Sequence, residues 1–171
     1  MGEAMDNERA VSLFVSYAHT DSAWMKRLAP LLKVRRFTQG LRSWHDQELK
    51  VGDPWDEEIQ NNLRLAEIVL CLVSIDFLAS DYIRDIELPI AMERHSKGQA
   101  IVIPLILYPI DLQHDCPQLA QLNPLPEWGK PWSEYNPYQK ALKPIGDGLK
   151  AVVDLAWRRA QLTSGMRIES K

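Results

Sequence analysis

The segment DFLASDYIRDIEL, at positions 76–88, contains four carboxylates that could do chemistry. A carboxylate can stabilise a developing positive charge or transfer a proton, and it does so best where water is excluded. Ser80 is predicted to cap a helix in this segment, and successive residues of a helix advance by about 100°. The isoleucines of this helix then form an apolar stripe that includes Glu87. The stripe contains Ile83, Ile86 and Ile90.

Glu87 differs from the other three acids because its side chain is predicted to face this stripe. Asp85 falls on the opposite face, and Asp81 lies in the first turn, where an acid stabilises the helix dipole. Asp76 follows the preceding strand as a loop residue. A carboxylate among apolar side chains loses hydration, which raises its pKa, and such a group is either paired or functional. Glu87 is therefore the one acid of the four that has no ordinary structural role by position alone.

Two structural alternatives for Glu87 stay open at this point. The carboxylate could pair with Arg84 or Arg94 at the edge of the stripe, since ion pairs also perturb the pKa of carboxylates. Pro89, which is unusual inside a helix, could instead kink the helix and turn Glu87 to solvent. Helical phase alone does not decide between these alternatives and a functional acid.

The elements that must position this acid alternate along the chain between strands and helices. Strands are predicted at 12–17, 41–46, 68–74 and 100–108, and helices at 23–40, 55–67, 80–98 and within 138–162. The third and fourth strands are apolar on both faces, as parallel strands between two helix layers are. The alternation predicts a flavodoxin-like α/β fold, with a parallel sheet covered by helices on both faces. Ligands of such sheets bind beyond the carboxyl ends of the strands.

Composition and charge exclude several kinds of partner. The net charge is -3 without a block of like charges, so neither nucleic acid nor a membrane is an expected partner. The first eight residues are acidic and lack the apolar region of a secretory signal, and no apolar run is long enough to span a bilayer. We therefore expect a cytoplasmic protein.

Several familiar sites are missing from the predicted loops. The first strand is not followed by GxGxxG or GxxxxGK[ST], no GxSxG surrounds a serine, and Asp76 lacks the acidic pair of a phosphorelay receiver. The four histidines are dispersed, and the two cysteines make neither a disulfide framework nor a metal knuckle. We predict no metal site and a core position for Cys71.

Four motifs occur in order at the predicted strand ends: LFVSYAHTD, WHDQELKVGDPWDEEI, LCLVSIDFLASDY, and IELPIAMERH leading into AIVIPLIL. With these motifs the chain resembles the TIR (Toll/interleukin-1 receptor) domain family, in particular its bacterial members, from about Leu13 to about Val153. The resemblance implies a five-stranded parallel sheet. It also implies a TIR domain at 11–160, between an N-terminal tail at 1–10 and a C-terminal tail at 161–171.

The resemblance also implies an activity, because many bacterial TIR domains cleave NAD+ at the nicotinamide–ribose bond. The products would be nicotinamide and either ADP-ribose or a cyclic isomer, with NAD+ as substrate and no cofactor. The catalytic glutamate of the family lies in a serine, aromatic, Glu-Leu pattern, which corresponds here to Ser80, Tyr82, Glu87 and Leu88. The expected substrate-binding residues are Ser16, Tyr17, Ala18, Asp46, Lys50, Trp55, Ser80 and Tyr82.

Each of these helper residues also has a structural explanation. Trp55 could anchor the start of a helix on the sheet, Asp46 could form a turn, and Ser80 and Asp21 could be helix caps. A ring such as that of Trp55 or Tyr82 could alternatively stack on a base.

Two main functions stay open. The first is an NADase that acts in antiphage defence or virulence and is active on self-assembly with other TIR domains, as a homo-oligomer or filament. The second is a non-enzymatic adaptor that works through TIR–TIR contacts of the KVGDPW loop. A more distant option is a nucleotide-sugar or nucleoside ribosyl transferase. An adaptor would not need a carboxylate in an apolar setting, so Glu87 favours the enzyme.

Overall fold

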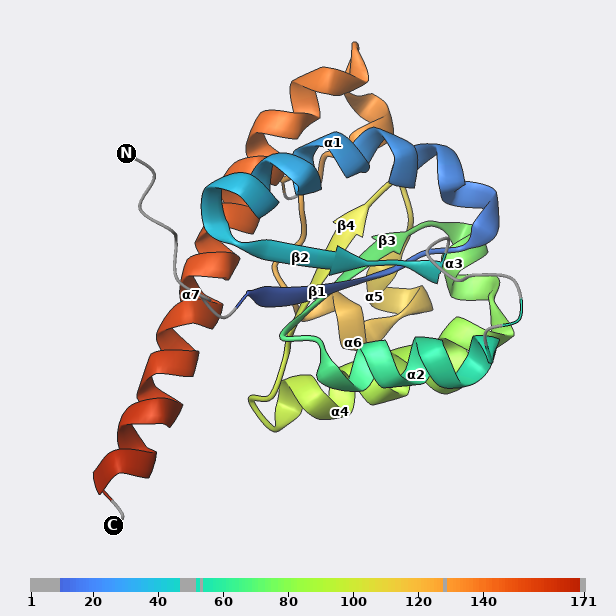
Figure 1. The fold of residues 1–171 in the computed structure, drawn as a ribbon. Coiled ribbons are helices and arrows are strands. Elements are labelled where there is room, and N and C mark those ends of the chain that lie inside the picture. Colours follow the sequence, from blue (N-terminus) through green and yellow to red (C-terminus); the bar gives the residue numbers. More distant parts are fainter. Residues whose placement is uncertain (1–9, 47–51, 53, 128, 170–171) are drawn as a thin grey trace.

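Four parallel strands form the sheet in the part of the chain that the computed structural model describes, residues 10–46, 52, 54–127 and 129–169. The strands are β1 (Val11–Ser16), β2 (Leu41–Trp44), β3 (Ile68–Val73) and β4 (Ile101–Ile106). Their order is β2-β1-β3-β4 (Figure 1). In this register Leu13 of β1 pairs with Ser43 of β2 and with Ile68 of β3. The predicted α/β class with a parallel sheet is confirmed.

The expected fifth strand is reduced to a single bridge among the described residues. Leu125 lies beside Leu105 of β4 and makes two backbone hydrogen bonds with that strand. Its neighbours are Pro124 and Pro126. The ladder with β4 ends at Leu125 in both directions among the described residues, and proline is disfavoured within strands. The prediction of five strands is therefore wrong by one.

Helices cover both faces of this sheet (Figure 1). They are α1 (Ser22–Gln39), α2 (Trp55–Leu65), α3 (Ile75–Ala79), α4 (Leu88–Ser96), α5 (Leu112–Asp115), α6 (Pro117–Ala120) and α7 (Leu142–Glu169). Helices α1 and α7 pack on one face, and α2 and α4 pack on the other, in two separate apolar clusters. Helix α7 includes residues 161–169, which were expected to belong to a tail. None of the helices in the described part of the chain has the length and apolar composition needed to span a bilayer.

Helix α1 follows its sequence pattern closely. Trp24, Leu28 and Leu32 are buried at helical spacing, and the helix ends at Gly40, whose φ of 65° is the left-handed conformation of a C-cap glycine. Asp21 occupies the N-cap position, but its side chain makes no capping hydrogen bond. The carboxylate accepts a hydrogen bond from the Ser74 hydroxyl instead, so the prediction of Asp21 as a cap is wrong.

The helix predicted at 80–98 is not regular. Ser80 caps it as predicted, since its Oγ accepts the backbone N–H of Ile83 at 3.3 Å. Residues Ile83–Glu87 then form a π turn, after which α4 begins at Leu88. The buried residues around this turn are Ile83, Glu87, Leu88 and Ala91, whereas Ile86 and Ile90 are only half-buried. The predicted apolar stripe therefore placed Glu87 correctly on the buried side of the helix. The π turn changed which apolar residues are buried beside it.

Candidate active site

Glu87 lies at the topological switch point of the sheet. From β1 the chain passes to β2 on one side and then to β3 on the other, so the carboxyl ends of β1 and β3 border a crevice where ligands of such sheets bind. Ser16 ends β1 and faces the side of α2 and α4, because it follows Phe14 by two residues. Its hydroxyl donates a 2.8 Å hydrogen bond to Glu87 Oε2.

The Glu87 carboxyl is held in an apolar setting, with only 7% of the residue exposed. Burial raises its pKa to about 7, the hydrogen bond from Ser16 lowers the pKa, and the negative charge of Asp46 raises it. The side chains packed around Ser16 and Glu87 are Leu63, Val69, Cys71, Leu88 and Ala91. A carboxyl with a pKa near neutrality is poised between its two protonation states, as catalytic carboxyls often are.

Neither structural alternative for Glu87 holds. Arg84 pairs with Asp81 and with Asp85 at 3.0 Å each, and all three side chains are exposed. Arg94 donates instead to backbone carbonyl oxygens at the end of α2. Pro89 does not turn Glu87 to solvent, because the carboxylate stays buried. Glu87 thus has no cationic partner among the described residues.

A cavity of about 470 Å³ opens beside Glu87. It brings together seven of the predicted site residues: Tyr17, Ala18, Asp46, Trp55, Ser80, Tyr82 and Glu87. Ser16 reaches the site through its hydrogen bond to Glu87, and Lys50 lies outside the described residues. The cavity also includes residues that were not among the predicted site residues: His19, Thr20, Ile59, Asp76, Ala79 and Ile83. His19 and Thr20 lie just beyond the end of β1, and that position was the signal that could have found them. Asp76, which was expected in a loop, lies in the first turn of α3.

Two aromatic rings form one wall of the cavity. The centroids of the Trp55 and Tyr82 rings lie 4.8 Å apart with an interplanar angle of 47°. The Tyr82 hydroxyl donates a 2.6 Å hydrogen bond to Asp56 Oδ1. Burial, and then this contact with Asp56, raise the pKa of Tyr82. Trp55 starts α2 but is 46% exposed, so it offers ring surface to the cavity rather than anchoring the helix in the core.

Tyr17 and Asp46 form the polar end of the cavity. Burial and the nearby Asp46 carboxylate raise the pKa of Tyr17. Asp46 Oδ2 lies 3.2 Å from Nε2 of the exposed His19. The Tyr17 hydroxyl and Asp46 Oδ1 are both buried, and a hydrogen-bonding interaction between these two side chains contributes to the raised pKa of Tyr17. Both residues line the cavity, so a ligand in it can reach them.

The family follows from comparison with known sequences. The family model described as TIR domain matches residues 13–141, which is most of the chain. The chain belongs to the TIR-domain family. It is 36% identical over 153 residues to the uncharacterized protein y4lF of Sinorhizobium fredii, a match that covers 90% of this chain and 46% of y4lF. The TIR domain described here thus spans about half the length of that relative.

A solved structure has the same fold. It is that of the TIR domains in the activated Roq1 resistosome, which directly recognises the pathogen effector XopQ. The TM-score is 0.59 at 16% sequence identity, and the match covers 82% of this chain and 99% of the Roq1 chain. At this identity the likeness concerns the fold alone.

A second buried hydrogen bond, besides the one between Ser16 and Glu87, joins the segments that follow β1 and β3 of this TIR domain. The Asp21 carboxylate accepts a hydrogen bond from Ser74 Oγ, which itself accepts the backbone N–H of Phe77 at 3.0 Å. Asp21 is only 4% exposed, and burial raises its pKa. The hydrogen bond between Asp21 and Ser74 holds together one edge of the crevice in which Glu87 lies.

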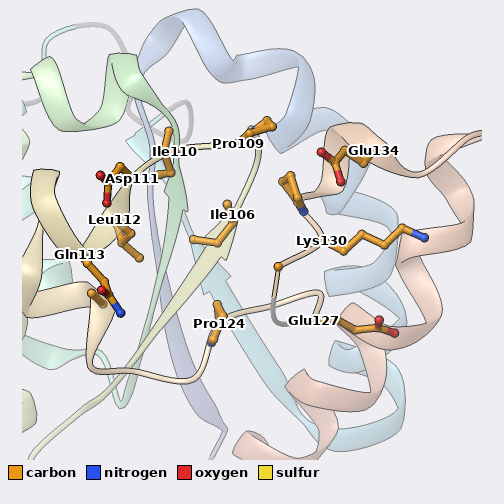
Figure 2. A pocket seen from close by; sticks show the side chains of 13 residues that line it. Ile106, Pro109, Ile110, Asp111, Leu112, Gln113, Pro124, Glu127, Lys130 and Glu134 are labelled. Atoms are coloured by element: carbon orange, nitrogen blue, oxygen red, sulfur yellow. The ribbon is translucent and has the colours of Figure 1, made fainter.

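Another cavity of this TIR domain, about 360 Å³, lies at the end of β4 (Figure 2). Its walls are mainly apolar, and its acids Asp111, Glu127 and Glu134 are exposed. Its described lining contains no buried carboxylate and none of the predicted site residues. The described residues also include no group of three side chains that could hold a metal ion. The cavity at Glu87 is therefore the candidate active site.

Proposed function

We propose that this TIR domain is an NAD+ glycohydrolase that cleaves the nicotinamide–ribose bond, with Glu87 as its catalytic carboxylate. The observation that carries the proposal is the burial of Glu87 at the switch point of the sheet. The carboxylate borders a cavity and has no cation beside it among the described residues. Burying a charge in this way is costly, so a functional reason is needed.

The proposed reaction requires few catalytic groups. Nicotinamide is already cationic in NAD+ and leaves as a neutral molecule, taking the electron pair of the bond to the ribose. Positive oxocarbenium character develops on the sugar, and an ionised Glu87 stabilises it, as carboxylates do in glycoside hydrolysis. Because Ser16 engages Oε2, Oε1 is the oxygen left to face the ribose. Attack by water releases a proton and gives ADP-ribose, whereas attack by the adenine of the same molecule gives a cyclic product.

The charge of the substrate also favours the active form of Glu87. At neutral pH its pKa of about 7 leaves roughly half of the free enzyme ionised. A nearby positive charge favours the ionised form of a carboxyl group, so the bound nicotinamide ring lowers this pKa. Ionised Glu87 and cationic substrate therefore stabilise each other in the complex.

The cavity suits the nicotinamide riboside half of NAD+. Its volume of about 470 Å³ lies within the range of small-molecule sites. Asp46 and Asp76 add negative charge to that of Glu87, which favours the cationic ring. Trp55 and Tyr82 offer aromatic surface for stacking, and the Tyr17 hydroxyl and the Asp46 carboxylate can bind hydroxyl or amide groups.

The diphosphate of NAD+ needs a cation that the described lining of this cavity lacks. No lysine or arginine of the described residues lines the cavity. Lys50, expected from the sequence to contact substrate, is one source of that cation, and a neighbouring protomer is another. The second source fits activity on self-assembly, and the Roq1 TIR domains come from an assembled resistosome. Such an enzyme would act in the cytoplasm, in antiphage defence or virulence.

The experiment that tests this function is release of nicotinamide from NAD+ by the purified protein over a wide range of protein concentrations. We expect release that rises more steeply than in proportion to protein concentration, because assembly is required. Chromatography of the products distinguishes ADP-ribose from a cyclic isomer. Absence of release at every concentration would contradict the proposal and leave the TIR–TIR adaptor.

A further inference from the structure

The π turn at Ile83–Glu87 is the local feature that carries the candidate catalytic acid. Within it, the backbone N–H of Leu88 bonds to the carbonyl of Ile83, five residues back rather than four. The turn therefore contains one residue more than an α-helical turn. One extra residue shifts the phase of the helix by about 100°, so the turn decides where the Glu87 side chain points.

Pro89 explains why the turn is wide. In a regular α-helix, residue 89 would donate its N–H to the carbonyl of Asp85, but proline has no N–H and its ring collides with that carbonyl. In the observed register α4 begins at Leu88, which places Pro89 in a first turn, where no N–H is needed. The Pro89 side chain is exposed, so it contributes little packing of its own. Its effect is on the backbone.

We propose that Pro89 is a positioning residue: by excluding the α-helical register across residues 85–89 it maintains the π turn, which aims the Glu87 carboxylate at Ser16. The hydrogen bond between Ser16 and Glu87, at 2.8 Å, is the contact that depends on this aim. Ser80 fixes the start of the helix through the N–H of Ile83, and Ala91 is buried in the core beyond the turn. Loss of the π turn would therefore rotate the residues on one side of it by about 100° relative to those on the other.

The test is the substitution Pro89→Ala, which supplies the missing N–H and removes the ring. We expect residues 83–89 to take the α-helical register, and Glu87 to lose Ser16 and turn toward solvent. The pKa of Glu87, followed by carbon NMR of the labelled side chain, should fall from about 7 toward 4.5, the ordinary value of a glutamate. The titratable groups that interact electrostatically with Glu87 in the described structure are Asp46, Cys71 and Tyr82.

A matched control is Pro30→Ala, which removes an exposed proline from inside α1. It should leave the pKa of Glu87 unchanged. Because alanine favours helices, both variants should fold, which circular dichroism can verify. A pKa that stays near 7 in Pro89→Ala would overturn the assignment of Pro89.

The consequence for turnover rests on the proposed NADase function. Misplacement of the catalytic carboxylate should lower nicotinamide release on the order of 100-fold, mainly in kcat. The NMR titration needs no activity, so the two ideas can fail separately. If the wild type releases no nicotinamide, the proposed function fails, whereas the shift of the Glu87 pKa still decides the role of Pro89.

Discussion

The hydroxyl of Ser16 and the carboxylate of Glu87 form a buried hydrogen bond of 2.8 Å between residues 71 positions apart in the sequence. The bond connects the end of a central strand to the turn that carries the acid. It lowers the pKa of Glu87 against the larger effect of burial. Ser16 therefore adjusts the pH range in which Glu87 is ionised.

Replacing Ser16 by alanine should shift the pH dependence of nicotinamide release. Without the hydroxyl the pKa of Glu87 rises above its value of about 7, because the interaction that lowers it is gone. Since the ionised form is the active one, the acidic limb of the kcat profile should move to higher pH. The exposed Ser96→Ala is the control. An unchanged acidic limb in Ser16→Ala would contradict the role given to this hydrogen bond.

Glu87→Gln should stabilise the fold at neutral and alkaline pH. The pKa of Glu87 is raised from 4.5 to about 7 in the folded protein, so between these values the folded state binds more protons than the unfolded state, and stability falls as pH rises. Above pH 7 the cost is on the order of 3 kcal/mol, which an uncharged glutamine avoids. Urea unfolding at pH 5 and pH 8 should show the larger gain at pH 8. The exposed Glu57→Gln should show no such difference, and an equal gain at both pH values in Glu87→Gln would be the contrary result.

Trp55→Ala should weaken substrate binding more than catalysis. Loss of the exposed ring removes a stacking surface, which is worth roughly 0.5–1.5 kcal/mol. We expect the KM for NAD+ to rise by about 2- to 12-fold, with a smaller change in kcat. Tyr82→Phe keeps the ring and removes only the hydroxyl that binds Asp56, so it is the matched comparison and should leave KM nearly unchanged. A KM unchanged by Trp55→Ala would show that the ring does not bind substrate.

Gly148→Ala should destabilise the domain at the place where the fifth strand is reduced to a bridge. A Cβ at this position of α7 would collide with a terminal carbon of Leu125, the residue that bridges to β4. Overpacking of this kind costs about 1–3 kcal/mol, which lowers the melting temperature by several degrees. Gly165→Ala in the same helix meets no atom within 4 Å and should be neutral or stabilising. Equal melting temperatures of the two variants would contradict this packing.

The sequence predicted the parallel α/β sheet and the burial of Glu87, because both follow from hydrophobic periodicity. It did not predict the π turn, since a phase of 100° per residue assumes a regular helix; Pro89 was the only sign of it. The fifth strand, expected from family resemblance, is reduced to one bridge at Leu125, which lies between two prolines. Long-range pairs such as Ser16 with Glu87, or Asp21 with Ser74, depend on tertiary neighbours that local patterns do not reveal.

The most direct measurement of the central claim is the rate of nicotinamide release from NAD+ by Glu87→Gln, compared with Asp85→Asn on the exposed side of the same turn. Glutamine keeps the size of the side chain and can still accept the hydrogen bond from Ser16, but it cannot stabilise a positive ribose. The account predicts that Glu87→Gln loses all measurable release while Asp85→Asn retains wild-type rates. Wild-type turnover by Glu87→Gln would contradict it.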